Sequence, residues 1–194
     1  MATAGVVLVA AGAFASYQDA DHTHDGARQG GSTSGQPTLA AARQVLAKPE
    51  PGSPRLVRLP VLDVSSRVVP IHALDRTLVP PSDPQLLGWW ADGAKPGAAK
   101  GSALVIGHTV HTGGGALDDL ENVRPGDPIV VRTDHDTLRY AVRRVRIYDK
   151  GSLARHAEDI FNQEVLGRLV LVTCEDWNGE RYLSNVVVTA TRHL

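Results

Sequence analysis

One thiol and two nearby imidazoles are the side chains of this sequence that are best suited to covalent chemistry. Cys174 is the only cysteine among 194 residues, and it ends the apolar run 169–173. His108 and His111 follow a similar run at 104–107. A free thiol has a pKa of about 8.5, and a neighbouring imidazole can take its proton or hold the thiolate by charge. The two runs therefore predict two strand ends that bring together the groups needed for acyl transfer through a thioester.

Burial offers a simpler interpretation of Cys174, since a free cysteine usually packs as a small hydrophobic side chain. The residues that follow it argue against that interpretation. Segment 175–179 is mostly polar and contains a glycine, which is typical of a strand that opens into a loop. We therefore expect Cys174 at the mouth of its strand.

Two other classes of protein remain open. Zinc favours four nitrogen, sulfur or oxygen ligands, which His108, His111 and Cys174, together with Glu175 or Asp176, would supply. A surface domain that binds peptides without catalysis would also carry this pattern. Stoichiometric zinc in the purified protein would favour the first class. Unchanged function after Cys174→Ala would favour the second.

The composition is that of an ordinary globular chain with one domain and a tail. Hydrophobic residues make up 42% and charged residues 21%, which suffices for one well-buried core. The formal net charge is −1, so nothing favours nucleic acid as a partner. The densest basic group, at 139–146, falls in an expected strand, where it would form a solvated face.

The N-terminal residues predict an anchor and a tether. Residues 5–15 are uncharged, but a helix through them covers only about 17 Å, short of the roughly 30 Å hydrocarbon core. We interpret residues 1–17 as a partial membrane anchor or signal remnant, with a frayed apolar tail as the alternative. Residues 18–54 are rich in glycine and proline and predict a flexible linker. The folded domain is expected at 55–194.

After residue 54 the pattern is that of a β protein. The slip in alternation at Arg143 and Arg144 predicts a β-bulge. Pro70 interrupts one expected strand, and helical pattern is confined mainly to 152–162. Short strands with turn signals and little helix favour a barrel or a sandwich. The expected strands cover residues 55–61, 64–71, 103–107, 129–132, 138–147, 169–174 and 185–191.

Four short motifs occur in an order that resembles the sortases, and within them the actinobacterial class E and F groups. They are Ile-Gly-His-Thr at 106–109, Arg-Pro-Gly-Asp at 124–127, Leu-Val-Thr-Cys at 171–174 and Asn-Val-Val-Val at 185–188. Each motif alone is weak or moderate, whereas their order and spacing together are specific. The resemblance covers about residues 56–191.

The resemblance implies an all-β fold, a closed eight-stranded barrel with short helices. It also implies a cysteine transpeptidase that cuts a sorting signal of the Leu-Pro-x-Thr-Gly type between Thr and Gly. Cys174 matches the nucleophile and His108 the catalytic histidine. Thr173 matches the family threonine before the nucleophile, and we expect it to contact substrate.

Sortases also place a catalytic arginine on the strand after the nucleophile, where it orients the substrate and stabilises the oxyanion. When the Asn-Val-Val-Val motif is aligned, that position falls on Leu183. Arg181 lies two residues earlier, on the same face of an extended strand. We therefore predict Arg181 as the third catalytic residue, with a surface arginine in a loop as the alternative.

The remaining expectations concern substrate and surroundings. His111 is predicted to contact substrate, although it can equally be a polar residue of the glycine-rich loop 112–115. Trp89, Trp90 and Trp177 either pack in the core or grip a peptide. No cofactor or metal is expected. The implied partners are surface proteins bearing a sorting signal and an amine of the peptidoglycan precursor or of a pilin. The implied location is the cell membrane, with a monomeric catalytic domain outside the cell.

Overall fold

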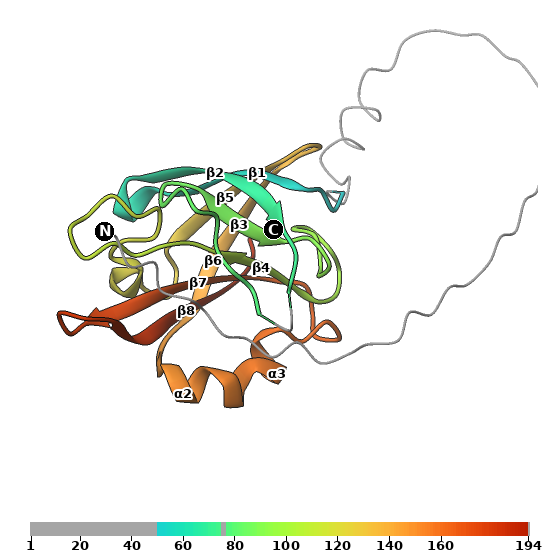
Figure 1. Cartoon of the computed structure of the whole chain (residues 1–194). Helices are drawn as coiled ribbons and strands as arrows, with labels where there is room; N and C mark the ends of the chain where they lie inside the picture. Colours follow the sequence, from blue (N-terminus) through green and yellow to red (C-terminus); the bar gives the residue numbers. More distant parts are fainter. Residues whose placement is uncertain (1–49, 75–76, 194) are drawn as a thin grey trace, which may run out of the picture. The chain divides into compact units, whose positions relative to one another are not determined.

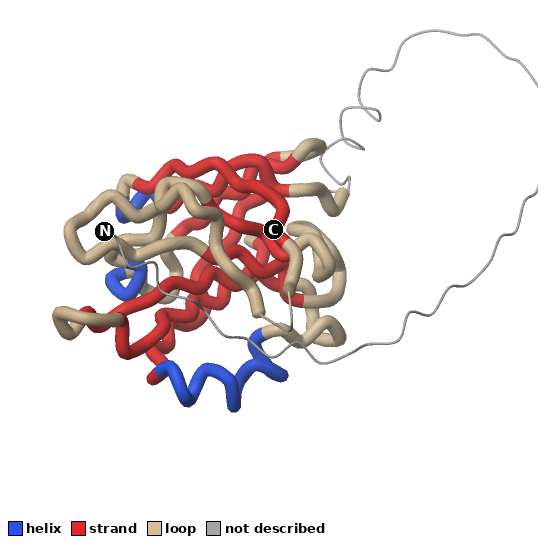
Figure 2. The backbone as a smooth tube through the Cα atoms, in the orientation of Figure 1, coloured by secondary structure: helices blue, strands red, loops and turns tan. Residues whose placement is uncertain are grey.

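A closed barrel of eight strands forms in the part of the chain that the computed structural model describes, residues 50–74 and 77–193 (Figures 1 and 2). The strand order around it is β1-β2-β3-β4-β7-β8-β6-β5. The all-β fold class and the closed eight-stranded barrel predicted from the sequence are confirmed. The strands are β1 (Pro54–Leu59), β2 (Val64–Ile71), β3 (Leu87–Trp90), β4 (Ser102–Ile106), β5 (Pro128–Thr133), β6 (Thr137–Asp149), β7 (Arg168–Trp177) and β8 (Tyr182–Arg192).

Two of the strand pairs are parallel, and one of them positions the site. β2 pairs with β3, and β4 pairs with β7 in a register that joins Ile106 to Val172. All five residues of β4 are buried, and Leu169–Cys174 of β7 are buried as well. Parallel strands covered on both faces read as continuous apolar runs, which is why these two segments stand out in the sequence.

Two apolar clusters cover the two faces of these strands. The barrel interior holds every second strand residue, such as Val105, Leu171 and Val188. The intervening residues, such as Ile106, Val172 and Val187, belong to a second cluster on the outside, which we call the outer cluster. A period of two along each strand produces this division.

A short helical segment covers the outer cluster. It consists of α2 (Lys150–Leu153), a 3-10 turn (Ala154–His156) and α3 (Ala157–Ile160), and it lies below β7 and β8 in Figure 1. Leu153, Ala157 and Ile160 pack into the cluster. The helix predicted over 152–162 is therefore present, but it is broken into single turns.

The bulge predicted at Arg143 is confirmed. The pairing of β6 with β8 shifts register between Val142 and Arg144, so that Arg143 and Arg144 both face outward. Val142 and Val145 then both pack against the barrel interior.

Two local predictions are corrected by the structure. β3 was not expected, because Leu87–Trp90 has only four residues and includes Gly88. β2 continues through Pro70, which is exposed and lies opposite Trp89 of the short strand β3. A proline destabilises a strand least where its position does not need to donate a hydrogen bond to the neighbouring strand. Pro70 therefore breaks the alternation in the sequence without ending β2.

The predicted anchor at 1–17 and nearly all of the linker at 18–54 lie outside the described residues. Within the described part, the chain is held from its first residues: the Gly52 amide donates to the Pro96 carbonyl and the Ser53 amide to the Asp134 carboxylate at 2.7 Å. Among the described helices, none has the length and apolar character needed to cross a membrane.

Candidate active site

The ends of β4 and β7 lie side by side, and they carry the predicted histidine and cysteine. The Gly107 amide donates to the Val172 carbonyl at 3.1 Å, which extends the parallel pairing beyond the last residue of β4. The same register, continued by two residues, sets His108 opposite Cys174. The structure therefore brings together two residues that are 66 positions apart in the chain.

Both side chains belong to the outer face of the barrel. A Cβ on Gly107 would lie 2.6 Å from Leu87 and 2.9 Å from Leu117, which are interior residues. Residue 107 thus faces inward and His108 faces outward. Cys174 is itself a member of the outer cluster. The two functional groups therefore share one face at one end of the barrel.

A main-chain carbonyl holds the imidazole. Nε2 of His108 lies 2.7 Å from the Pro81 oxygen, and the residue is 7% exposed. A carbonyl oxygen only accepts hydrogen bonds, so Nε2 is the donor. In the neutral ring this leaves Nδ1 as the nitrogen that can take a proton. The Leu117 amide also donates to the His108 carbonyl, which fixes the backbone at this position.

The thiol is buried to a similar extent and has an asparagine beside it. Cys174 is 4% exposed, and its Cα partner on β8 is Asn185. Nδ2 of Asn185 lies 3.7 Å from the cysteine Sγ. Sequence reasoning used Asn185 only to align a motif. The available signal was the alternation along β8, which puts Asn185 on the same face as Val187.

Thr173 ties the two strand ends together. Its hydroxyl donates to the Gly107 carbonyl at 3.1 Å and lies 2.7 Å from the hydroxyl of Thr109. The residue is fully buried, and its hydroxyl is engaged with these two groups of the protein. Its predicted contact with substrate stays a prediction.

Arg181 lies in the turn that joins β7 to β8. Its amide donates to Oδ1 of Asn178 at 2.9 Å, and its carbonyl accepts from the Asn178 amide. The side chain is exposed, as is Leu183 two residues later. The structure thus puts Arg181 at the rim of the hairpin, and its catalytic role stays a prediction.

An aromatic stack stands beside the strand ends. The exposed His111 ring lies on Trp177 with centroids 4.3 Å apart and planes 7° from parallel. Trp177 in turn contacts Tyr182 at 5.0 Å. This stack forms a flat aromatic surface near the strand ends. Trp89, by contrast, is buried in the barrel interior.

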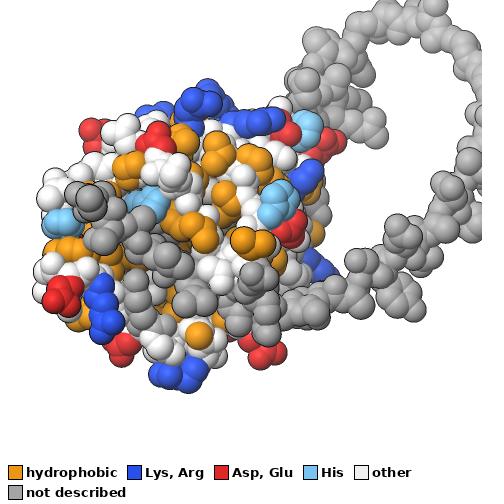
Figure 3. Space-filling model, in the orientation of Figure 1, with side chains coloured by type: hydrophobic (Ala, Val, Ile, Leu, Met, Phe, Trp, Pro, Cys, Tyr) orange, Lys and Arg blue, Asp and Glu red, His pale blue; other side chains and the backbone are white. Residues whose placement is uncertain are grey.

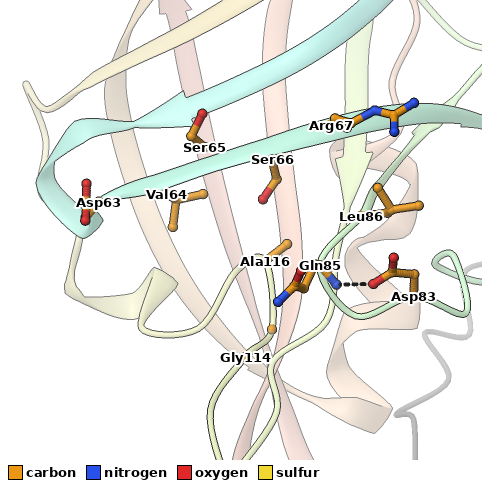
Figure 4. Close-up of a pocket in the computed structure, with 11 residues that line it drawn as sticks. Asp63, Val64, Ser65, Ser66, Arg67, Asp83, Gln85, Leu86, Gly114 and Ala116 are labelled. Carbon is orange, nitrogen blue, oxygen red and sulfur yellow. Dashed lines mark hydrogen bonds between the residues drawn. The ribbon is translucent and has the colours of Figure 1, made fainter.

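A cavity of about 570 Å³ lies between β2 and two loops of the barrel (Figure 4). Its walls are the start of β2, segment 83–86 and the glycine-rich loop at 114–116. These two loops also frame the histidine, since the first follows Pro81 and the second includes Gly115, against the His108 carbonyl. Figure 3 shows one face of the molecule, on which apolar side chains gather in the middle and charged ones toward the edges.

Among the described side chains, no group of three or more His, Cys, Asp or Glu is arranged to hold a metal ion. His111 is engaged in its stack with Trp177, whereas His108 is bonded to Pro81.

A closed barrel that presents a cysteine and a histidine on adjacent strand ends has the equipment of a cysteine acyl-transfer enzyme. The comparison with protein families identifies it further. A family model described as "Sortase domain" matches residues 57–193, so the chain belongs to the sortase family. It is a cysteine transpeptidase of the kind that acts on surface proteins.

Solved structures of sortases share the fold. Sortase C-1 from Streptococcus pneumoniae is 19% identical, with a TM-score of 0.56 over 77% of this chain and 69% of that chain. Sortase C-1 from Actinomyces oris is 18% identical, with a TM-score of 0.56 over 84% and 83%. A lid mutant of sortase A from Corynebacterium diphtheriae is 21% identical, with a TM-score of 0.55 over 84% and 83%. A search of curated proteins found no significant match.

Proposed function

We propose that this chain is a class E/F-like sortase that cleaves an LPXTG-like sorting signal between Thr and Gly. It then transfers the acyl group to an amine of the cell-wall precursor or of a pilin. The observation that carries the proposal is the pairing of β4 with β7, whose ends bear His108 and Cys174 on one face. The order of the four sequence motifs supports the same assignment.

In the first half-reaction the thiolate of Cys174 attacks the carbonyl carbon of the signal's threonine. The tetrahedral intermediate collapses as the C–N bond to glycine breaks, and the electron pair leaves with the nitrogen. His108 donates a proton to that amine, which departs with the C-terminal part of the signal. The products are a thioester on Cys174 and a neutral imidazole.

In the second half-reaction an acceptor amine attacks the thioester carbon. The imidazole of His108 removes a proton from the attacking nitrogen, and the C–S bond breaks to restore the thiolate. The Pro81 carbonyl supports both steps, because its bond to Nε2 keeps the ring oriented and strengthens when the ring is cationic.

Three further residues complete the proposed site. Arg181 stabilises the oxyanion from the rim of the β7–β8 hairpin, as the family's arginine does. His111 contacts the signal peptide through the flat surface that it forms with Trp177. Thr173 acts through the protein, because its hydroxyl keeps the two strand ends in register. Since its side chain is buried, we propose that Thr173 contacts the substrate through its backbone.

The proposed setting is the outer face of the cell membrane. Residues 1–17 anchor the chain and residues 18–54 act as a tether, so that the domain at 55–194 works as a monomer. Its partners are surface proteins that carry the sorting signal and the amine acceptor. This assignment is supported by the family and by the composition of the N-terminal residues.

Incubation of the protein with a fluorogenic sorting-signal peptide tests the proposal. Mass spectrometry should detect the acyl adduct on the parent protein and none on Cys174→Ala, because no other thiol exists in the chain. His108→Ala should slow turnover by about 100-fold or more, the usual worth of a positioned acid or base.

His135→Ala provides the matched control, since His135 is exposed in the turn between β5 and β6. It should retain parental turnover. Equal turnover by Cys174→Ala and the parent would refute the mechanism, and stoichiometric zinc in active protein would redirect it to a metal site.

A further inference from the structure

The strand after the nucleophile carries no arginine near the site. β8 reads Tyr-Leu-Ser-Asn-Val-Val-Val-Thr-Ala-Thr-Arg from residue 182 to residue 192, and its one arginine, Arg192, pairs with Tyr140 at the far end. The residue directly across from Cys174 is Asn185. The place on this strand that faces the reactive sulfur is thus held by a neutral amide.

The asparagine side chain is fixed with its amino group toward the nucleophile. Nδ2 lies 3.2 Å from the Thr173 carbonyl and 3.7 Å from the Cys174 sulfur, and the residue is 2% exposed. Because the Thr173 oxygen only accepts hydrogen bonds, the amino group and not the carbonyl of Asn185 must face it. That amino group has two hydrogens, one for each of these two partners.

We propose that Asn185 is a catalytic residue of this enzyme, whose amide donates a hydrogen bond to the Cys174 thiolate. It faces the nucleophile from β8, a strand that carries no arginine near the site. The inference rests on the proposed function for its meaning in catalysis. Its central claim, a donor to the sulfur, stands independently of any substrate.

The bond discriminates between the two states of the sulfur. A hydrogen bond to an ionised acceptor is stronger and shorter than one to the neutral group, so the amide favours the thiolate over the thiol. Burial strengthens this preference, because water competes little at a site that is 2% exposed. The second bond, to the Thr173 carbonyl, keeps the donor from turning away.

Among the side chains that the structure describes, two titratable neighbours of this pair lie on or just beyond the adjoining strands. Tyr148 of β6 is the Cα partner of Asn185 on the side away from Cys174. His108 lies just past the end of β4, the strand on the other side of Cys174. The row across the sheet is therefore Tyr148, Asn185, Cys174 and His108. Among these, Asn185 is the one that cannot ionise, so it remains a donor at every pH.

Alkylation of the only cysteine measures the effect directly. The full-length protein is treated with iodoacetamide from pH 5 to pH 10, and the rate of modification is followed by mass spectrometry. Asn185→Ala should react about tenfold more slowly at neutral pH and shift the profile upward by about one pH unit, and Asn185→Asp should change it in the same direction. The aspartate should shift it further, because its charge opposes the thiolate.

Asn122→Asp is the matched control, since Asn122 is exposed in a 3-10 turn remote in sequence from Cys174 and bonds to Glu121. Its alkylation profile should superimpose on that of the parent. Profiles of Asn185→Ala and Asn185→Asp that stay within twofold of the parent would overturn the inference. So would a loss of peptide transfer with unchanged alkylation, which would make Asn185 a structural residue.

A measurement on the parent protein guards against variants that fail to fold. The side-chain amide resonances of Asn185 should move with pH through the midpoint of the alkylation profile, and this movement should vanish in Cys174→Ala. Resonances that do not move with the thiol would contradict the inference. If the parent fails to process the peptide but the alkylation shift is found, the donor stands and the proposed substrate fails.

Discussion

At the scale of single residues, Gly107 shows how closely the histidine is tied to the packing beneath it. A side chain at this position would meet Leu87 and Leu117, both fully buried in the barrel interior. Gly107→Ala should therefore lower the free energy of unfolding by about 1–3 kcal/mol, the usual cost of overpacking. Peptide turnover should fall as well, because the imidazole follows directly. Chemical denaturation and the fluorogenic assay measure the two effects.

Gly151→Ala is the counterpart, since a Cβ there would meet nothing within 4 Å. Gly151 lies in α2, where alanine is favoured over glycine by about 1 kcal/mol. This variant should be slightly more stable than the parent with the same turnover. A destabilised Gly151→Ala, or a Gly107→Ala as stable as the parent, would contradict the packing argument.

The sequence was enough to propose Cys174 and His108 as the reacting residues, but it did not reveal the groups that hold them. Cys174 stood out because it is the only cysteine, and both Cys174 and His108 follow an apolar run. The Pro81 carbonyl did not stand out, because any residue supplies a carbonyl and the contact spans 27 positions. Asn185 was hidden for another reason: an amide on a strand carries no signal until the register shows that it faces Cys174.

At the scale of elements, the bulge in β6 can be tested by deletion. Arg143 and Arg144 both face outward, so removal of Arg143 restores simple alternation without turning any later residue to the other face. We expect the protein lacking Arg143 to keep the barrel and lose about 1–2 kcal/mol, including the bond from Arg143 to the Thr191 hydroxyl. Circular dichroism and thermal unfolding provide the readout.

Deletion of Arg146 is the matched experiment on the same strand. No bulge lies at that point, so the deletion would turn Tyr148, which is 9% exposed, away from the outer cluster. Withdrawal of a buried aromatic side chain costs about 3–5 kcal/mol. If both deletions proved equally harmful, the bulge would not be what absorbs the extra residue.

The same element shows what alternation can reveal. The slip at Arg143 predicted the bulge because the apolar residues on either side of it are in different phases. The short strand β3 left no such trace, since four residues with a glycine among them display hardly one full period. The helical segment was visible but not its breaks, which arise where 3-10 and α turns alternate over the outer cluster.

At the scale of the whole molecule, a tyrosine inside the barrel links stability to alkaline pH. Burial raises the pKa of Tyr140 above its ordinary value, although the Gly97 amide that bonds its hydroxyl at 2.9 Å and the nearby Arg192 charge lower it in part. The unfolded chain therefore loses this proton more readily than the folded one. The stabilisation is complete below about pH 10 and is lost as the pH rises toward the folded pKa.

Tyr140→Phe isolates the contribution of the Tyr140 hydroxyl to the pH dependence of stability. At pH 7 the variant should be about 1–2 kcal/mol less stable, because the buried Gly97 amide loses its acceptor. As the pH rises above 10, the parent should lose stability faster, and the difference between the two should narrow. Urea titrations at pH 7 and at several values above pH 10 make the comparison, and a gap that widens would reverse the assigned sign.

The whole-molecule prediction succeeded where the local ones were incomplete. A barrel requires only that several strands have one buried face each. This condition produces an alternation of apolar and polar residues along much of the chain. The closure of the ring and the order β4-β7-β8-β6 depend on contacts between distant segments. The closed ring was predicted only through the resemblance to a family, and the strand order was not predicted, since no local pattern contains it.

The parallel pairing of β4 with β7 also determines when, during synthesis and folding, the proposed reactive pair can form. Between the two strands the chain must first lay down β5, β6 and the helical cover, so sulfur and imidazole meet only after nearly every residue has been synthesised. Contacts of such long sequence separation form late and slowly. During synthesis the imidazole of His108 therefore exists long before the thiol, and the pair can form only when β7 docks beside β4.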